Sequence, residues 1–373
     1  MQTIINYNMK TIKNFIILLS LIIFMTSSSA VMQDQIPSFS RRTKNIILFI
    51  GDGMGIAHVT AGMTVSDRAL NLQKFPYSGF AITQSADNYI TDSAAGGTAI
   101  ACGVKTNNGM IGVTPDNTSV ASITEIVHRR GLSTGIVSTS SVTHATPASF
   151  VAHNSSRGSY EDIALHFLNG SVDVFMGGGE DHFRKRADGR DLATELVNQG
   201  FELVYTMDDL KASRSDKVAG LLARVHMSTV NEGRTGHLEE MTGKAIEILS
   251  RDRDGFFLIV EGSMIDWGSH ANDLGYVISE TIDMDSAIGV AIDFANKNRQ
   301  TLIVVTADHE TGGLVLTDGN SAERKVSAVF GTTDHSGTMV PIFSYGPGAQ
   351  KFSGIHDNTF FLDAFLNLLR IRK

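Results

Sequence analysis

The stretch NIILFIGDGMG, residues 45–55, runs from an almost unbroken apolar segment into a glycine-rich turn. Because polar and apolar residues do not alternate in the apolar segment, it is typical of a strand that helices bury on both faces. Asp52 stands directly beyond the carboxyl end of this strand. Open α/β sheets hold their ligands at that edge, so the stretch predicts both the class of fold and the place of a functional site.

Apolar runs of the same kind recur at residues 79–84, 134–139, 173–176, 256–261, 301–306 and 340–346. The segments between them include 119–131 and 239–251, whose apolar residues have helical spacing. We therefore predict an α/β fold, a three-layer α/β/α sandwich around a mostly parallel central sheet, over residues 31–373 as a single domain with small peripheral insertions. The more polar residues 180–240 are expected to be helices and loops at the periphery.

Composition limits the kind of partner. The chain has 373 residues, of which 42% are hydrophobic and 19% are charged, and this composition is globular. The formal net charge is −8 and no basic cluster follows a nucleic-acid backbone, so we predict no nucleic-acid-binding surface. Cys102 is the single cysteine, which excludes an intramolecular disulfide and a cysteine zinc site. We expect it to be a small buried residue of a helix.

The N-terminus has the pattern of a secretory signal peptide. Lys10 and Lys13 precede the apolar run at residues 15–25, and the small residues SSSA follow it. We predict that residues 1–30 are removed by cleavage near Ala30, and that the run is too short for a stable membrane span. An exported chain without disulfides is expected in the periplasm or the medium. The alternative is an uncleaved N-terminal anchor.

The segment TDSAAGGTA, residues 91–99, places a serine beside an acid and then a run of small residues. One interpretation is a helix that begins at Ser93, where free backbone N–H groups and the positive end of the helix dipole can meet an anion. Small neighbours would then let a bulky substrate come close. The alternative is an ordinary N-cap packed tightly against the sheet.

Further acids and histidines stand where other predicted strands end. GDGMG lacks the spacing of a dinucleotide loop, and an aspartate would repel a pyrophosphate, so Asp52 is favoured as a metal ligand over a phosphate loop; an Asx turn or cap is the alternative. In EGSMIDWGSH, residues 261–270, Asp266 and His270 lie on one face of a helical turn, where they can share a metal. Glu261 is expected to serve a different centre. A surface acid and a capping histidine are the alternative.

Two adjacent residues and two weaker candidates complete the set. Asp308 and His309 would face opposite sides of a regular strand, so they can bind one ion only where the strand breaks into a loop; a solvent-facing turn is the alternative. His335 lies in a Gly/Thr/Ser-rich loop, where an exposed histidine is common. Arg157 offers a planar fork for a phosphate, unless it is a surface arginine. Oxygen and nitrogen donors without thiolates suit zinc or magnesium, and paired metal ions favour phosphoryl displacement.

In chain order, GDGMG, TDSAAGGTA, THATPASFVAH-x3-R, EGSMIDWGSH, TADHETGG and TTDHSG resemble the motifs of the alkaline phosphatases, from about residue 45 to residue 348. The resemblance implies hydrolysis of phosphate monoesters to an alcohol and inorganic phosphate. It implies a two-step in-line mechanism through a phosphoseryl intermediate, assisted by two zinc ions and one magnesium ion. The family often forms homodimers, and the short segment 312–333 indicates a compact member.

The resemblance also implies a role for each matching residue. Ser93 would be the nucleophile, and Arg157 would bind two non-bridging phosphate oxygens. The implied ligands are Asp266, His270 and His335 for one zinc ion, Asp52, Asp308, His309 and Ser93 for the other, and Asp52, Thr146 and Glu261 for magnesium. His144 and Trp267 stand where other members have Asp and Lys. We expect His144 near the third ion, directly or through water, and the alternatives for that ion are magnesium, zinc or a weakly held ion. Beside Trp267 we expect weaker product binding and faster release.

The residues alone also allow two other classes of protein. A metal hydrolase of the same superfamily could act on phosphodiesters or sulfate esters. Ser93 is unlike the nucleophile of the sulfatases, and Arg157 together with a third metal favours monoesters. A non-catalytic phosphate- or metal-binding protein would have lost a ligand or the nucleophile, and this sequence retains them all.

Overall fold

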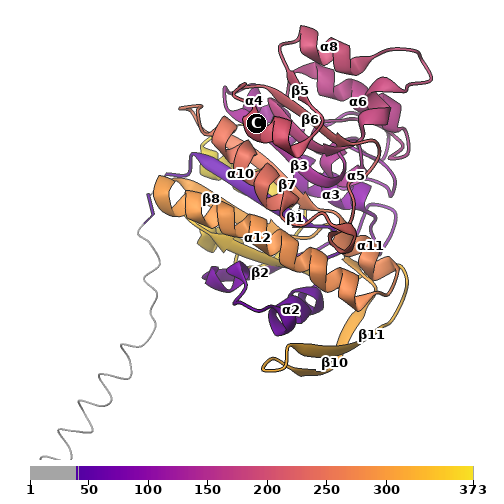
Figure 1. Cartoon of the computed structure of the whole chain (residues 1–373), viewed down its shortest axis with the longest axis vertical. Coiled ribbons are helices and arrows are strands. Elements are labelled where there is room, and N and C mark those ends of the chain that lie inside the picture. The colour runs from indigo at the N-terminus through magenta and orange to yellow at the C-terminus, as the bar shows by residue number, and fades with distance from the viewer. Residues whose placement is uncertain (1–38, 41, 373) are drawn as a thin grey trace, which may run out of the picture. The chain divides into compact units, whose positions relative to one another are not determined.

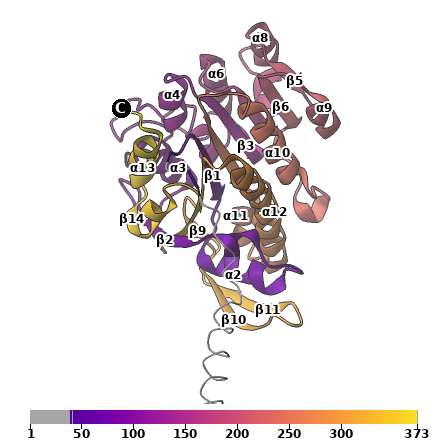
Figure 2. The ribbon, with the colours of Figure 1, turned by 90° about the vertical axis from the view of Figure 1, so that its left-hand side faces the viewer.

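The structure is a computed structural model that describes residues 39, 40 and 42–372. The predicted signal peptide, residues 1–30, and its cleavage near Ala30 lie outside the described residues. Helices cover both faces of a central sheet (Figures 1 and 2), so the predicted α/β sandwich is confirmed. Among the described helices, none is long and apolar enough to cross a membrane.

In the described part of the chain, the main sheet has ten strands in the order β14-β2-β13-β8-β1-β7-β3-β4-β6-β5. Their bounds are β1 (Asn45–Gly51), β2 (Tyr77–Ile82), β3 (Ser133–Ser141), β4 (Val174–Gly178), β5 (Glu202–Val204), β6 (Val218–Ala223), β7 (Phe256–Gly262), β8 (Thr301–Thr306), β13 (Val340–Tyr345) and β14 (Gly354–Asp357). Within this sheet β13 runs antiparallel to both of its neighbours, and the other adjacent pairs are parallel. The sheet is therefore mostly parallel, as predicted.

Two helical layers enclose the sheet, with α3, α4 and α13 on one side and α10 and α12 on the other (Figure 2). The described helices are α2 (Ile56–Val65), α3 (Ser93–Cys102), α4 (Ile123–His128), α5 (Ala145–Ala148), α6 (Tyr160–His166), α7 (Glu180–Arg184), α8 (Leu192–Asn198), α9 (Met207–Ala212), α10 (His237–Leu249), α11 (Met264–His270), α12 (Leu274–Asn298), α13 (Phe360–Leu369) and the short 3-10 helices η1 (Asn71–Lys74), η2 (Phe167–Asn169), η3 (Val230–Glu232) and η4 (Ala349–Phe352). Because both faces are covered, β1, β7 and β8 are buried along their whole length. This burial explains their unbroken apolar sequences.

The segment 180–240 differs from the prediction of helices and loops alone. It adds β5 and β6, which pair in parallel and form one edge of the main sheet. β5 has three residues and β6 has six, and each lies between polar stretches. Apolar runs as short as these cannot be told from helix segments by periodicity. The segment therefore belongs partly to the sheet.

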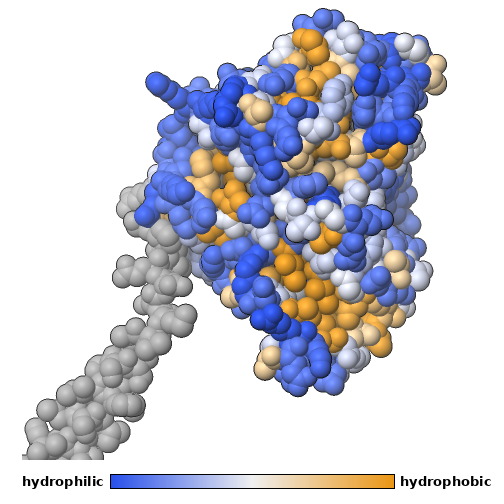
Figure 3. Space-filling model, viewed as in Figure 1, coloured by the Kyte–Doolittle hydropathy of each residue, from blue (hydrophilic) through white to orange (hydrophobic). Residues whose placement is uncertain are grey.

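The segment 312–333 forms a hairpin of β10 (Leu314–Asn320) and β11 (Lys325–Phe330), at the lower edge of Figure 1. A second pairing, of β9 (Glu310–Thr311) with β12 (His335–Ser336), closes its base. The insertion is therefore modest, as predicted, and its two ends meet. Figure 3 shows apolar residues gathered on the face over α2, beside this hairpin.

Candidate active site

The adjacent parallel strands β8, β1, β7 and β3 end at one edge of the sheet, and the candidate residues gather there. Asp52 follows β1, Glu261 lies near the end of β7, and Asp308 follows β8. The turn after β1 needs Gly53, which has a φ of +71°; a Cβ on it would lie 2.9 Å from Cα of Asp266. This glycine of GDGMG thus lets the turn of Asp52 approach the segment that carries Asp266.

Ser93 is the first residue of α3, as predicted, and is 2% exposed. Asp92 caps the helix by accepting a hydrogen bond from the Ala95 N–H at 3.0 Å. The Ser93 hydroxyl oxygen lies 3.1 Å from Nε2 of His309. The candidate nucleophile therefore stands at the positive end of a helix, against one of the candidate metal ligands. Cys102, at the other end of this helix, is buried as expected.

The glycines of α3 pack against protein rather than making room for a substrate, which corrects our expectation. A Cβ on Gly96 would lie 2.8 Å from the carbonyl oxygen of Asp308, and one on Gly97 would lie 2.9 Å from Oγ of Ser149. Every residue of α3 is buried. The glycines therefore bring the Asp308 loop and α5 close to the helix that carries Ser93. The helix begins at Ser93 as predicted, and its small residues serve close packing, as the alternative interpretation expected.

Gly96→Ala is expected to lower the free energy of unfolding by about 1–3 kcal/mol, because the new methyl group must displace the backbone at Asp308. Thermal unfolding of the purified protein measures this change. Gly243→Ala in α10 is the matched control, since its methyl group would make an ordinary 3.6 Å contact with Val290. The control should stabilise the protein by about 0.5–1 kcal/mol. Equal melting temperatures of the two variants would contradict the close packing of α3.

Arg157 is held at the start of α3 rather than standing free on the surface. Its Nη1 donates to Oδ2 of Asp92 at 2.9 Å, and its Nη2 lies 3.5 Å from Nε2 of His144. The side chain is 29% exposed, so it is partly open to solvent. Sequence reasoning missed Asp92 as the partner of Arg157, because 65 residues separate the two.

Acidic and histidine side chains form three groups in the described part of the chain, and the donor atoms of each group lie within 4.8 Å of one another. The groups are Asp266, His270 and His335; Asp52, Asp308 and His309; and Asp52, His144 and Glu261. The first two groups match the acids and histidines of the implied zinc sites. The third joins His144 to two of the implied magnesium ligands. Glu261 and Asp266 fall in different groups.

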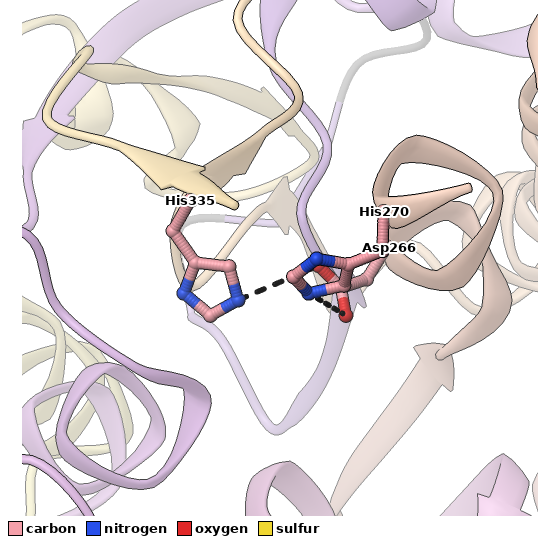
Figure 4. Close-up of side chains that lie close together, drawn as sticks. All are labelled: Asp266, His270 and His335. Carbon is pink, nitrogen blue, oxygen red and sulfur yellow. Dashed lines mark ion pairs between the residues drawn. The ribbon is translucent and has the colours of Figure 1, made fainter. Parts of the chain in front are cut away.

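The first group brings two histidines toward one carboxylate (Figure 4). Nε2 of His270 lies 3.3 Å from Oδ2 of Asp266, and Nε2 of His335 lies 3.7 Å from Oδ1. Nδ1 of His270 lies 2.6 Å from the carbonyl oxygen of Thr333. Nδ1 of His335 lies 2.9 Å from the carbonyl oxygen of Thr91. Histidines that bind metals are oriented in this way, with the second ring nitrogen donating to a fixed acceptor.

The second group is fully buried beyond the end of β8. Nε2 of His309 lies 3.4 Å from Oδ1 of Asp52 and 3.3 Å from Oδ2 of Asp308, and these three side chains are 0% exposed. Because β8 ends at Thr306, Asp308 and His309 lie in the loop that follows, where both can face one point. Thr146 adjoins the group, with Oγ1 at 3.5 Å from Asp52 and 3.4 Å from Asp308.

In the third group, Glu261 is held by hydroxyl groups that sequence reasoning missed. Its Oε2 accepts hydrogen bonds from Ser138 at 2.6 Å and from Ser263 at 2.7 Å. Its Oε1 is buried without a hydrogen-bond partner, and so is Oδ1 of Asp52. Buried polar atoms without partners are rare, and carboxylate oxygens left in this way fit a cation. The strand pattern gave no signal for Ser138, because a small hydroxyl residue fits within a buried strand.

Burial of several carboxylates in one place perturbs their pKa values. Burial, with the nearby charge of Asp266, raises the pKa of Asp308 to about 6, and burial raises the pKa of Glu261 to about 7. Burial and the neighbouring acids raise the pKa of Asp52 well above its usual range. Burial also opposes the charge of Asp266, but the hydrogen bond from His270 and nearby histidines bring its pKa well below the usual range. The site therefore favours added positive charge.

An aromatic rim adjoins the third group. The rings of His144 and Trp267 lie 6.0 Å apart, so the two positions that vary in the family lie together. Burial and the nearby charge of Arg157 lower the pKa of His144 to about 3, which keeps its imidazole neutral and able to bind a cation. The ring of His226 lies 4.8 Å from that of Trp267. Sequence reasoning missed His226, because it belongs to the segment predicted to be peripheral.

Comparisons with known proteins show which family the chain resembles in sequence and fold. The alkaline phosphatase family model matches residues 43–329. Alkaline phosphatase 4 of Bacillus subtilis is 32% identical over 414 residues, covering 88% of this chain and 89% of its own. The structure of alkaline phosphatase from the Antarctic bacterium TAB5 has a TM-score of 0.85 and 40% identity, covering 89% of this chain and 100% of its own. A variant of that enzyme with magnesium in a site called M3 has a TM-score of 0.84 and 39% identity, covering 91% of this chain and 100% of its own.

The family model matches residues 43–329, and these relatives cover most of the chain. The relatives also share its fold. From this agreement of sequence and fold, we conclude that the chain belongs to the alkaline phosphatase family of hydrolases.

Proposed function

We propose that the chain hydrolyses phosphate monoesters to an alcohol and inorganic phosphate, with Ser93 as the nucleophile. The observation that carries the proposal is the buried Ser93 hydroxyl at the start of α3, 3.1 Å from Nε2 of His309. A serine hydroxyl is a weak nucleophile until its proton is removed. The positive end of the helix dipole favours the alkoxide, and so would a cation bound by the neighbouring Asp52, Asp308 and His309. The candidate residues would contact the phosphate group and not the rest of the substrate, so we expect the enzyme to accept many different leaving groups.

The reaction would proceed in two in-line steps. In the first, the Ser93 hydroxyl gives its proton to water and its Oγ bonds to phosphorus as the bond to the leaving oxygen breaks; that oxygen takes a proton from water to give the alcohol. In the second, a water oxygen bonds to phosphorus, the bond to Ser93 breaks, and Ser93 regains a proton as inorganic phosphate leaves. Arg157 would bind two non-bridging oxygens in both steps, and Asp92 keeps its guanidinium oriented.

We further propose that the three groups hold two zinc ions and one magnesium ion. Asp266, His270 and His335 would hold one zinc ion, Asp52, Asp308, His309 and Ser93 the other, and Asp52, Thr146 and Glu261 the magnesium ion. Nitrogen and carboxylate donors suit zinc, whereas carboxylate and hydroxyl oxygens suit magnesium; His144 leaves zinc as the alternative third ion. The unpartnered oxygens of Asp52 and Glu261 support the fit. Such ions, when bound, neutralise the attacking and leaving oxygens and lower the pKa of a water molecule.

Hydrolysis of p-nitrophenyl phosphate at alkaline pH tests the proposed activity. The purified mature protein should release p-nitrophenol, lose activity in EDTA, and recover it when zinc and magnesium are returned. Bis-p-nitrophenyl phosphate and p-nitrophenyl sulfate represent the diesterase and sulfatase alternatives, and both should react far more slowly. No monoester turnover by the metal-replete protein would refute the proposal.

Trp267→Lys is expected to make inorganic phosphate a stronger inhibitor, lowering its inhibition constant by about tenfold, because an ammonium group at the rim would attract the phosphate dianion. Trp267 lies beside His144, whose Nε2 is 3.5 Å from the guanidinium of Arg157. Inhibition of p-nitrophenyl phosphate hydrolysis by added phosphate measures the change. Trp267→Gln is the matched control, since it removes the indole without adding charge. An unchanged inhibition constant in the lysine variant would rule out this role.

We propose that the chain forms a homodimer through the apolar face over α2 (Figure 3). Ile56 of α2 is 47% exposed, and the cross-strand partners Val315 and Val329 are each 54% exposed in the hairpin that α2 contacts. Large apolar side chains gathered on one face, unlike isolated ones, are typical of an association surface. Light scattering after size-exclusion chromatography measures the particle mass, and the mass of a single chain would refute the dimer.

We also propose that the protein is exported. Residues 1–30 would be cleaved near Ala30, leaving residues 31–373 as one catalytic domain with small peripheral insertions, in the periplasm or the medium. The lysines, apolar run and small residues of the N-terminus support this proposal. N-terminal sequencing of the exported protein tests it, and an intact N-terminus would indicate an uncleaved anchor instead.

A further inference from the structure

The glycine run 177–179, at the end of β4, lets two loops cross closely beside the site. A Cβ on Gly178 would overlap the carbonyl oxygen of Val225 and would lie 3.0 Å from Cα of His226. Gly179 has a φ of +106°, a conformation that residues with a side chain rarely adopt. The glycines therefore determine how closely the loop after β6 approaches, and this loop carries His226.

His226 is fixed at the rim by a hydrogen bond and by ring contacts. Its Nδ1 accepts a hydrogen bond from the backbone N–H of Ser141 at 3.0 Å, which leaves a neutral ring with its proton on Nε2. Its ring stands edge-on to Trp267, with centroids 4.8 Å apart at 81°. It also stands edge-on to His144, with centroids 5.8 Å apart at 86°. Rings in this arrangement and at these distances attract each other, so His226 contacts both variable positions.

His144 needs such support because few polar groups hold its ring. Its Nδ1 is buried without a hydrogen-bond partner, and its Nε2 lies 3.5 Å from Nη2 of Arg157, at the limit of a hydrogen bond. Its ring contacts are with His226 and Trp267. Packing by these two rings therefore restricts the direction of His144, which belongs to the third acid–histidine group.

We propose that His226 is a positioning residue for the third cation site, because its ring and that of Trp267 hold the His144 ring beside Asp52 and Glu261, the carboxylates of that site. This inference rests on the proposed function, which places a magnesium ion in the third group. His226 acts through its two neighbours and not on the reacting atoms. Removing a side chain that orients a metal ligand typically weakens metal binding by about 10–100-fold.

Two substitutions separate the ring of His226 from its hydrogen bond. His226→Asn keeps an acceptor for the Ser141 N–H and removes the ring, whereas His226→Phe keeps a ring and removes the acceptor. If the asparagine variant does not fold, His226→Gln takes its place. Trp267 is the only tryptophan in the sequence, so its fluorescence reports the rim directly. His356→Ala is the matched control. His356 lies in β14, the outer strand on the side of the sheet away from β6 and His226, and its ring stacks on Phe360.

Magnesium chloride is titrated into the zinc-loaded protein and followed by tryptophan fluorescence and by calorimetry. We expect His226→Asn to bind magnesium at least about tenfold more weakly and to shift the emission of Trp267 to longer wavelength, while His226→Phe and His356→Ala stay within about threefold of the wild type. Wild-type magnesium affinity in the asparagine variant, or equal losses in both His226 variants, would overturn the proposal. Because both readouts measure binding, absence of monoester hydrolysis in the wild type would count against the proposed function instead.

Discussion

Ser93→Ala is expected to lower the turnover of p-nitrophenyl phosphate by at least about three orders of magnitude, because it removes the atom that forms the bond to phosphorus. Water would then have to attack the substrate directly, although Arg157 and the acid–histidine groups remain in place. Ser93 is buried at the start of α3, where Asp92 supplies the cap, so alanine should leave the helix intact. Turnover at alkaline pH, with zinc and magnesium present at equal protein concentration, gives the ratio.

Ser149→Ala is the matched control for this prediction. Ser149 packs on the same helix, close to Gly97, and donates to the carbonyl oxygen of Ala145 at 2.8 Å. Ser149 belongs to none of the three acid–histidine groups, so this variant should keep most of its turnover. Acid quenching with radiolabelled substrate should also trap phosphate on the wild-type chain and not on Ser93→Ala. Labelled protein or wild-type turnover in the alanine variant would show that another residue is the nucleophile.

Removal of the cations with EDTA is expected to lower the melting temperature by about 10 °C or more. Each ion present at a thousand times its dissociation constant stabilises the folded protein by about 4 kcal/mol, and each kcal/mol corresponds to about 2 °C in a large domain. Asp52, Asp308 and Glu261 are fully buried together, so the cation-free protein retains their repulsion. Differential scanning calorimetry of EDTA-dialysed and reloaded protein measures the change, with dialysis in plain buffer as the control.

The gap in melting temperature between the cation-loaded and the cation-free protein should widen as the pH rises from about 5 to about 9. The hydrogen bond to Asp266 raises the pKa of His270 to about 9, and burial raises the pKa of Glu261 to about 7. A group whose pKa is raised by folding favours the folded state below its unfolded-state pKa, and this stabilisation is lost as the pH rises through the folded-state value. The cation-free protein therefore weakens in this range, whereas bound cations replace the protons. A constant gap would contradict the assignment of His270 and Glu261 as ligands.

The strands nearest the site could be predicted because the sheet buries them on both faces. β1, β7 and β8 lie at its centre, and continuous apolar segments suit that position. β5 and β6 are short strands at one edge, and their sequences carry too little periodicity to separate strand from helix. β13 was recognised as a strand, but its direction depends on its partners β8 and β2, which are far away in the sequence.

The candidate residues of the proposed site were visible in the sequence, whereas the residues that hold them in place were not. Each reactive residue lies in a short motif next to a strand or a helix start, and those motifs also identify the family. Ser138 reaches Glu261 across 123 residues, and Ser141 reaches His226 across 85. Such contacts follow from the order of strands in the sheet, which local patterns do not encode. His335 had the weakest local signal, and the pairing of β9 with β12 is what brings it to the site.

Because the base of the β10–β11 hairpin is closed, an insertion at its tip need not disturb the proposed active site. Because β9 and β12 are paired below the hairpin, residues can be added at its tip without moving His335 away from Asp266. The entropic cost of a longer loop is small, about 0.6 kcal/mol for each doubling of its length. The tip is therefore the point at which evolution, or an engineer, can add a lid, a binding arm or a tether while the proposed cation ligands keep their places.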